Sequence, residues 1–128
     1  MDAITESIER VATAVVNAAY SVHRRLGPGL LESVYEICLA HELRKSGLGV
    51  RSQVAVPVMY DGLQLDAGFR IDLLVGESVI VELKAIERLM PVHTAQVLTY
   101  LKLTGYRLGF LINFNVELIK QGIKRIAL

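Results

Sequence analysis

The spacing of apolar residues predicts two helices in the first third of the chain. Over residues 3–26, apolar side chains recur at three- and four-residue steps, which is the period of one face of an α-helix. Gly27-Pro28-Gly29 should end this helix, because glycine and proline both interrupt helical backbone. A second helical pattern covers about residues 30–46 and stops before Gly47 and Gly49. The chain should therefore begin with two consecutive helices joined by a short break.

The middle of the chain carries strand patterns joined by short turns. Asp61-Gly62 is a strong tight-turn signal, and Gly76-Glu77-Ser78 forms a second turn. Gly68, inside the second strand, permits a bend or bulge. The predicted strands cover residues 50–60, 63–75 and 79–84.

The last part of the chain is predicted to add one helix and two strands. Pro91 suits the first turn of a helix that continues over residues 92–104. Residues 107–114 form an apolar strand, and we interpret residues 123–128 as a final strand. The element order α-α-β-β-β-α-β-β indicates an α/β or α+β fold built on one mixed sheet. We expect a single domain over residues 1–128.

Composition adds an expectation about assembly. Hydrophobic residues make up 52% of the chain and the mean hydropathy is +0.42, which is high for a small soluble protein. Either the core is unusually full, or a partner covers an apolar face. We expect a homodimer that uses the small apolar residues of the first helix. These residues are Ala12, Val15, Val16 and Ala19.

Net charge and cysteine content only partly restrict the function and the location of the protein. A net charge of +1 neither requires nor excludes a nucleic-acid partner. Cys38 is the single cysteine, so no internal disulfide can form, and a cytoplasmic location fits. The N-terminus is acidic, unlike a signal peptide, and the apolar run over residues 11–20 is too short to span a bilayer.

Charged residues interrupt apolar strands at Asp72, Glu82 and Lys84. Burying an unpaired charge costs free energy, so such side chains must form ion pairs, bind a metal or face a cleft. The turn at Gly76-Glu77-Ser78 should place Val75 opposite Val79, and therefore Asp72 opposite Glu82, with Cβ atoms about 5 Å apart. Two carboxylates there repel each other unless a hard cation such as Mg²⁺ or Mn²⁺ lies between them. The alternative without a function is an ion pair between Lys84 and either acid.

Strict alternation along each strand also predicts which residues share a face. Glu82 and Lys84 should point the same way as Ile80. Asp72 should share a face with Leu74 and Arg70. The opposite face of that second strand should carry Phe69, Ile71, Leu73 and Val75.

Two of the predicted helices carry further candidates. Glu32 lies in the first turn of the second helix, where the helix dipole favours an acid even without a function. Tyr35 follows three residues later on nearly the same side. His93, Gln96 and Tyr100 share one face of the third helix. For these residues a structural role and a role at the site both stay open.

Taken together, these residues resemble a known family. Asp72, then Glu82-Leu83-Lys84, then Gln96 with Tyr100, resembles the PD-(D/E)xK nuclease superfamily. The heptad Gly29-Leu30-Leu31-Glu32-Ser33-Val34-Tyr35 looks like the G-x-x-E-x-x-Y signature of its GxxExxY branch. The resemblance covers about residues 27–128, and it departs from the pattern at Ile71, where the name of the superfamily has proline.

The resemblance implies a fold and a set of roles. The fold would be the restriction-endonuclease-like αβββαβ core with a mixed sheet, preceded here by an extra helix over residues 1–26. Asp72 and Glu82 would be metal ligands, with the backbone carbonyl of Leu83 as a candidate third ligand and Glu32 as an additional acid. Lys84 would orient the attacking water or stabilise charge on the phosphate. Gln96 and Tyr100 would support the site.

We therefore interpret the chain as a cytoplasmic nuclease that uses Mg²⁺ or Mn²⁺ to hydrolyse DNA. The alternatives are an inactive nuclease-fold module that binds nucleic acid or a protein partner, and a purely structural oligomer. The sequence does not choose between branched, single-stranded and duplex substrates, or between endo- and exonuclease action. The basic residues that could contact nucleic acid are Arg24, Arg25, Arg44, Lys45, Arg51, Lys120, Lys124 and Arg125.

Overall fold

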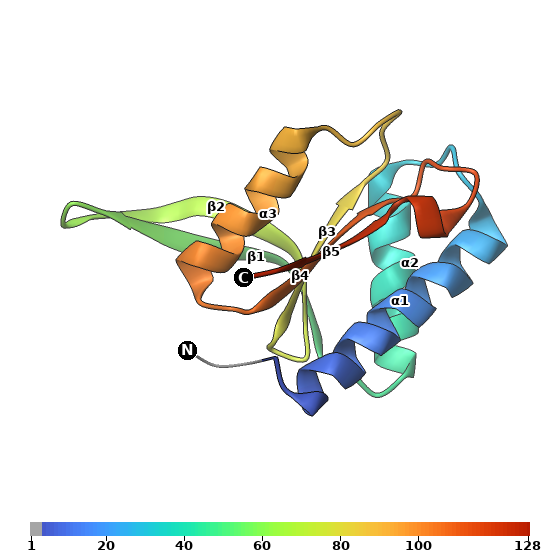
Figure 1. Cartoon of the computed structure of the whole chain (residues 1–128), viewed down its shortest axis with the longest axis horizontal. Coiled ribbons are helices and arrows are strands. Elements are labelled where there is room, and N and C mark those ends of the chain that lie inside the picture. The colour runs from blue at the N-terminus through green and yellow to red at the C-terminus, as the bar shows by residue number, and fades with distance from the viewer. Residues whose placement is uncertain (1–3) are drawn as a thin grey trace.

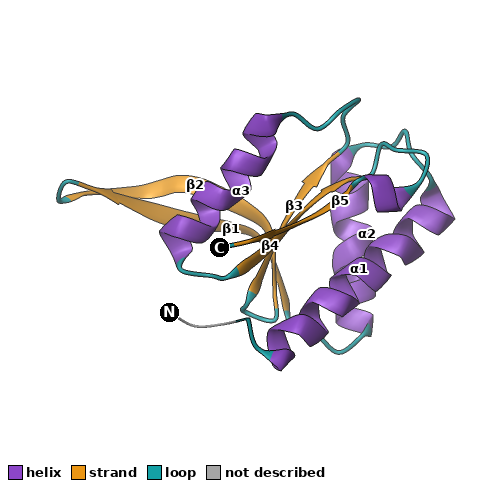
Figure 2. Ribbon diagram, in the orientation of Figure 1, coloured by secondary structure: helices purple, strands orange, loops and turns teal. Residues whose placement is uncertain are grey.

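A mixed five-stranded sheet separates two helical layers in the computed structural model, which describes residues 4–128 (Figure 1). Helices α1 and α2 cover one face of the sheet and α3 covers the other (Figure 2). The elements are α1 Glu6–Leu26, α2 Glu32–Lys45, β1 Val50–Tyr60, β2 Leu63–Val75, β3 Val79–Lys84, α3 Pro91–Thr104, β4 Leu108–Asn113, a 3₁₀ turn Ile119–Gln121 and β5 Ile123–Ala127. The predicted α+β class and the extra N-terminal helix are confirmed.

The strands lie in the order β1-β2-β3-β4-β5. All neighbouring strands are antiparallel except β3 and β4, which are parallel and joined through α3. The register between β2 and β3 places Val75 opposite Val79, as the three-residue turn predicts. This topology puts Asp72 of β2 beside the end of β3, from which the chain connects to α3.

The helix boundaries follow from local capping. The hydroxyl oxygen of Thr5 accepts a hydrogen bond from the Ile8 N–H at 3.3 Å, so α1 begins at Glu6 rather than at residue 3. Ala3 itself lies outside the described residues. Gly27, with φ +68°, ends α1 as predicted, and its N–H donates to the His23 carbonyl. Over residues 4–128, no helix has both the length and the apolar character needed to cross a membrane.

The face of α1 that we expected to form a dimer interface is part of the core. Ala12, Val15 and Ala19 are at most 3% exposed and pack against the sheet of the same chain. Val16 packs partly against the same cluster. Because Ala12, Val15 and Ala19 are already covered within one chain, the prediction that they join two protomers is wrong. The high apolar content instead fills two layers of core, one on each face of the sheet.

The strands β1 and β2 both exchange faces at one position, which strict alternation does not predict. On β2, Leu73 and Val75 pack on the side of α1 and α2, but Ile71 packs on the side of α3. On β1, Val50 packs on the first side and Val54 on the second, although both numbers are even. The prediction that Phe69 and Ile71 share the face of Leu73 and Val75 is therefore wrong, since Phe69 also packs on the α3 side.

On β1 the exchange has a local backbone cause. Gln53 lies opposite Asp72, between the paired positions Ser52–Leu73 and Val54–Ile71. Its φ of +52° is in the left-handed region, which turns the strand over at this residue. Beyond this point the β1–β2 hairpin extends away from α1 and α2 (Figure 1). Further along, a bulge between Val56 and Val58 fits the predicted bend at Gly68, where a Cβ would lie 2.1 Å from Val58 Cγ2.

Candidate active site

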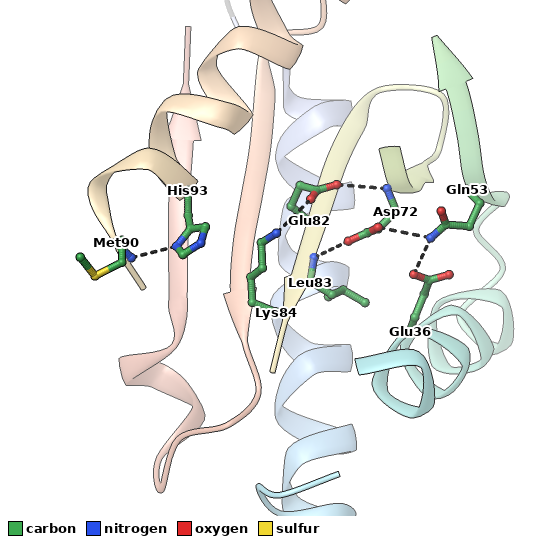
Figure 3. Close-up of polar contacts among 8 residues, drawn as sticks. All are labelled: Glu36, Gln53, Asp72, Glu82, Leu83, Lys84, Met90 and His93. Carbon is green, nitrogen blue, oxygen red and sulfur yellow. Dashed lines mark hydrogen bonds and ion pairs between the residues drawn. The ribbon is translucent and has the colours of Figure 1, made fainter. Parts of the chain in front are cut away.

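The strands β2 and β3 separate where the two predicted acids lie. Their backbone pairing runs from Val75–Val79 to Leu73–Val81. Beyond Leu73–Val81, the two strands are joined by hydrogen bonds from backbone N–H groups to side-chain carboxylates. The Asp72 N–H donates to Glu82 Oε1 at 3.2 Å, and the Leu83 N–H donates to Asp72 Oδ2 at 2.9 Å (Figure 3). Each carboxylate thus accepts a backbone N–H from the opposite strand. The opened end of the strand pair places both acids together.

Lys84 completes the strand part of the site. Its Nζ lies 4.0 Å from Glu82 Oε2, and its side chain is 20% exposed against 5% for that of Glu82. Alternation along β3 puts both side chains on one face, as predicted. The structure therefore brings together Asp72, Glu82 and Lys84. An ion pair between Lys84 and Glu82 accounts for part of this arrangement, but among residues 4–128 no basic side chain forms an ion pair with Asp72.

Electrostatics make Glu82 unusual. Its pKa is raised to about 8, first by burial and then by the nearby charge of Asp72. The hydrogen bond from the Asp72 backbone and the charge of Lys84 act in the opposite direction. The carboxyl therefore holds a proton through much of the neutral range unless a cation occupies the space beside it. Acids whose pKa is shifted this far are often found at functional sites.

The helix α2 carries two further acids whose charges interact with that of Asp72. Glu32, its first residue, has a pKa raised by burial and then by the charge of Asp72, while Lys84 lowers it. Glu36, one helical turn later, also has a raised pKa, first from burial and then from Asp72. We did not predict Glu36, although its spacing of four residues from Glu32 places it on the same helix face.

Tyr35 has a structural role in the heptad. Its ring stacks on Phe114 with centroids 4.7 Å apart, and its hydroxyl donates to the Gly27 carbonyl at 2.6 Å. The same hydroxyl accepts from the Leu30 N–H at 3.1 Å. Gly29, with φ +97°, adopts a conformation that favours glycine. The glycine and tyrosine of the heptad thus shape the loop that positions Glu32 at the start of α2.

The helix α3 approaches the acids from the other side of the sheet. Burial raises the pKa of Tyr100, and the charge of Glu82 is the next cause, which places the phenol close to the acids. Its ring stacks on Phe69 at 4.2 Å between centroids. The Gln96 side chain interacts with this phenol and lowers its pKa. Gln96 also lines a shallow groove of about 460 Å³ together with Lys84, Val92, His93, Ala95 and Thr99.

His93 serves the start of α3 rather than the acids. Its Nδ1 accepts a hydrogen bond from the Met90 N–H at 2.8 Å, so the imidazole caps the helix (Figure 3). This contact supports the structural interpretation of His93. The ring still borders the groove beside Lys84.

The donor set fits a magnesium-type ion better than a zinc-type ion. Within residues 4–128, no three His, Cys, Asp or Glu side chains converge closely enough to hold a metal by themselves. Mg²⁺ usually binds through one or two carboxylates and keeps several waters, so the pair Asp72 and Glu82 suits it. Zinc prefers histidine and cysteine, and no histidine or cysteine hydrogen-bonds to either acid in the described residues.

Comparison with known protein families agrees with this geometry. A model of the PD-(D/E)XK nuclease superfamily matches residues 9–126. The chain belongs to the PD-(D/E)XK nuclease superfamily. No curated protein and no solved structure matches it. PD-(D/E)XK proteins are generally hydrolytic nucleases.

The residues at the opened strand pair carry the side chains that the PD-(D/E)XK name spells out. In the sequence, Asp72, Glu82 and Lys84 fit the order of two acids and a lysine that the name gives, and Ile71 precedes Asp72 where the name has proline. The match also spans α2, which carries Glu32, and α3, which carries Gln96. Gln53 belongs to the same cluster, but nothing in the sequence pattern identified it, because its position depends on the left-handed turn of β1.

Proposed function

We propose that this protein is a divalent-cation-dependent nuclease that hydrolyses phosphodiester bonds in DNA. The observation that carries the proposal is that Asp72 and Glu82 lie together where β2 and β3 separate, with Lys84 beside them. Membership of a nuclease superfamily supports the reaction class. The heptad from Gly29 to Tyr35 supports the GxxExxY branch within it.

Asp72 and Glu82 are the residues that would hold a Mg²⁺ or Mn²⁺ ion, with the Leu83 carbonyl as a third ligand and Glu32 as a further acid. The raised pKa of Glu82 supports this assignment, because a cation beside the carboxyl would offset the repulsion from Asp72. A bound divalent cation would supply an acidified water and offset charge on the phosphate.

Lys84 has a separate role. Its ammonium group lies at the edge of the acid pair and lines the groove that leads toward α3. A cation in that position stabilises the negative charge that develops on a phosphate during hydrolysis. Gln96, which lines the same groove, and Tyr100, which lies close to Glu82, would help to position the phosphate or its water.

Location and assembly remain predictions from composition. The single cysteine fits a cytoplasmic protein. The homodimer stays a prediction, but α1 cannot supply its interface through the small apolar residues that are covered within one chain. Exposed apolar side chains occur elsewhere, including Leu31, Ile37 and Tyr60.

Two substitutions test the nuclease proposal. Glu82→Gln and Lys84→Ala should each retain the fold and lower DNA cleavage by about 10²–10³-fold, the usual effect of losing one electrostatic stabiliser. Glu82→Gln should also weaken Mn²⁺ binding, because it removes a ligand charge. Lys84→Ala should leave Mn²⁺ binding intact or tighter, because it removes a cation from an acidic site. Mn²⁺ titration and cleavage assays on branched, single-stranded and duplex DNA measure these effects.

The control is Lys102→Ala, which removes an exposed lysine from the last turn of α3 and should cut like the wild type. If the wild type binds Mn²⁺ yet cuts none of the DNA substrates, the enzyme proposal fails. It also fails if Lys84→Ala cuts as well as the wild type. The inactive binding module then becomes the better interpretation.

A further inference from the structure

The Gln53 side chain joins two acids of the candidate site. Its Nε2 lies 2.9 Å from Glu36 Oε1 and 3.2 Å from Asp72 Oδ1 (Figure 3). A primary amide nitrogen carries two hydrogens, so it can donate one to each carboxylate. The opposite orientation of the amide would turn its carbonyl oxygen toward two carboxylates, which repel it. The contacts therefore define both the position and the orientation of this side chain.

The backbone of Gln53 is held in a costly conformation. Its φ of +52° lies in the left-handed region, where glycine is the residue with the least strain. The Arg70 guanidinium donates to the Gln53 carbonyl at 3.3 Å and helps to hold it there. Strained non-glycine residues gather at functional sites, where the side chain offsets the cost of the backbone. Among the described residues, the Gln53 side chain forms hydrogen bonds only with Glu36 and Asp72.

The consequence for Asp72 is restraint from two sides. Its Oδ2 accepts from the Leu83 N–H at 2.9 Å, which comes from β3. Its Oδ1 accepts from Gln53, which comes from β1. Donors on both oxygens fix the rotation of the carboxylate about its own axis. In metal sites such outer donors orient the ligand, and their removal weakens binding although they never touch the ion.

We propose that Gln53 is a positioning residue, which bridges Glu36 to Asp72 and holds the Asp72 carboxylate ready for a divalent cation. This inference rests on the proposed function, since it concerns the same acid pair. It extends the site to β1 and to a second acid of α2. The left-handed turn at which β1 exchanges faces also places the Gln53 amide against Asp72.

The decisive variant is Gln53→Gly, which removes the amide and relieves the backbone strain together. We expect Mn²⁺ affinity to fall by about 10–100-fold, with a similar loss of DNA cleavage. The thermal midpoint of the metal-free protein should stay equal to that of the wild type or rise. A side chain that serves only the fold would give the reverse, a lower midpoint with unchanged Mn²⁺ affinity. Isothermal titration with Mn²⁺ and thermal unfolding measure the two quantities.

Two variants of Glu36 form a matched pair. Glu36→Gln keeps an oxygen that can accept from Gln53, whereas Glu36→Ala removes both the acceptor and the acid. Both remove one negative charge, so the difference between them reports the bridge. We expect Glu36→Ala to weaken Mn²⁺ binding several-fold more than Glu36→Gln. Equal effects of the two variants would contradict the bridge.

The results separate this inference from the proposed function. If the wild type binds Mn²⁺ and cuts DNA, while Gln53→Gly does both equally well, the positioning role is wrong and the nuclease proposal stands. A lower thermal midpoint for Gln53→Gly with unchanged Mn²⁺ affinity also overturns the positioning role. If the wild type neither binds Mn²⁺ nor cuts DNA, the nuclease proposal fails and the positioning role fails with it.

Discussion

Tyr35 illustrates how one residue can prepare a site without touching its chemistry. The ring is fully buried against Phe114, and the hydroxyl bridges the Gly27 carbonyl and the Leu30 N–H. Both backbone groups belong to the loop between α1 and α2. Because Glu32 begins α2 directly after this loop, the position of its carboxylate depends on that hydroxyl.

At this scale we predict that Tyr35→Phe destabilises the protein by about 1–3 kcal/mol, the usual cost of leaving buried polar groups without partners. The stack on Phe114 should survive, so the loss comes from the two hydrogen bonds. Urea unfolding measures the free energy. The control is Tyr20→Phe, which removes the hydroxyl of a tyrosine that is 38% exposed on α1. Equal stability of Tyr35→Phe and wild type would show that water replaces the hydroxyl.

At the scale of elements, α3 is seated on the sheet through a close approach at Gly109. A Cβ added there would lie 2.9 Å from Val97 Cγ1 of α3 and 3.4 Å from the Ile80 carbonyl oxygen. Glycine therefore sets the distance between α3 and β4. Since α3 also carries Gln96 and Tyr100, this spacing helps to determine where their side chains lie relative to Glu82.

We predict that Gly109→Ala destabilises the fold by about 1–3 kcal/mol, because the added methyl group overpacks the contact with Val97. The same substitution in a Val97→Ala background should cost less, since the clashing methyl group is gone. A double-mutant cycle measured by urea unfolding gives this coupling. Additive effects of the two substitutions would contradict the packing explanation.

At the scale of the whole molecule, the acids near Asp72 make folding dependent on pH. Burial and the charge of Asp72 raise the pKa of Glu82 from 4.5 to about 8, and the pKa values of Glu32 and Glu36 shift in the same direction. A raised pKa means that the folded chain binds more protons than the unfolded chain between those values. The free energy of unfolding of the metal-free protein must therefore fall as the pH rises through this window.

We predict a decrease of up to about 1.4 kcal/mol per pH unit from Glu82 alone. Stability from this group is fully present below pH 4.5 and is lost as the pH approaches about 8. Glu82→Gln should reduce the slope, with a remainder from Glu32 and Glu36. Urea unfolding at several pH values, with a chelator present, measures it. An unchanged slope in Glu82→Gln would show that Glu82 is already ionised in the metal-free protein.

Much of the fold and part of the site could be predicted from local patterns. The helix end at Gly27, the turn at 76–78 and the register of Val75 with Val79 each depend on a few neighbouring residues. The same holds for the meeting of Asp72 with Glu82, which follows from the length of one turn. Such features are encoded over short stretches of chain, so residue spacing alone identifies them.

The remaining features depended on contacts between distant segments. The alternation rule assumes that a strand keeps one orientation along its length. The left-handed Gln53 breaks this rule on β1, so residues before and after it pack on opposite sides from those that alternation predicts. The spacing of apolar residues does not show which residue has a left-handed backbone. The approach of Glu36 and Gln53 to Asp72 joins α2, β1 and β2, whose relative positions are set by packing. Likewise, the small residues of α1 could have faced a partner or the sheet. The sequence by itself determined which residues are apolar, charged or turn-forming, whereas only the tertiary structure decided what each of them faces, because burial is a property of the packed chain.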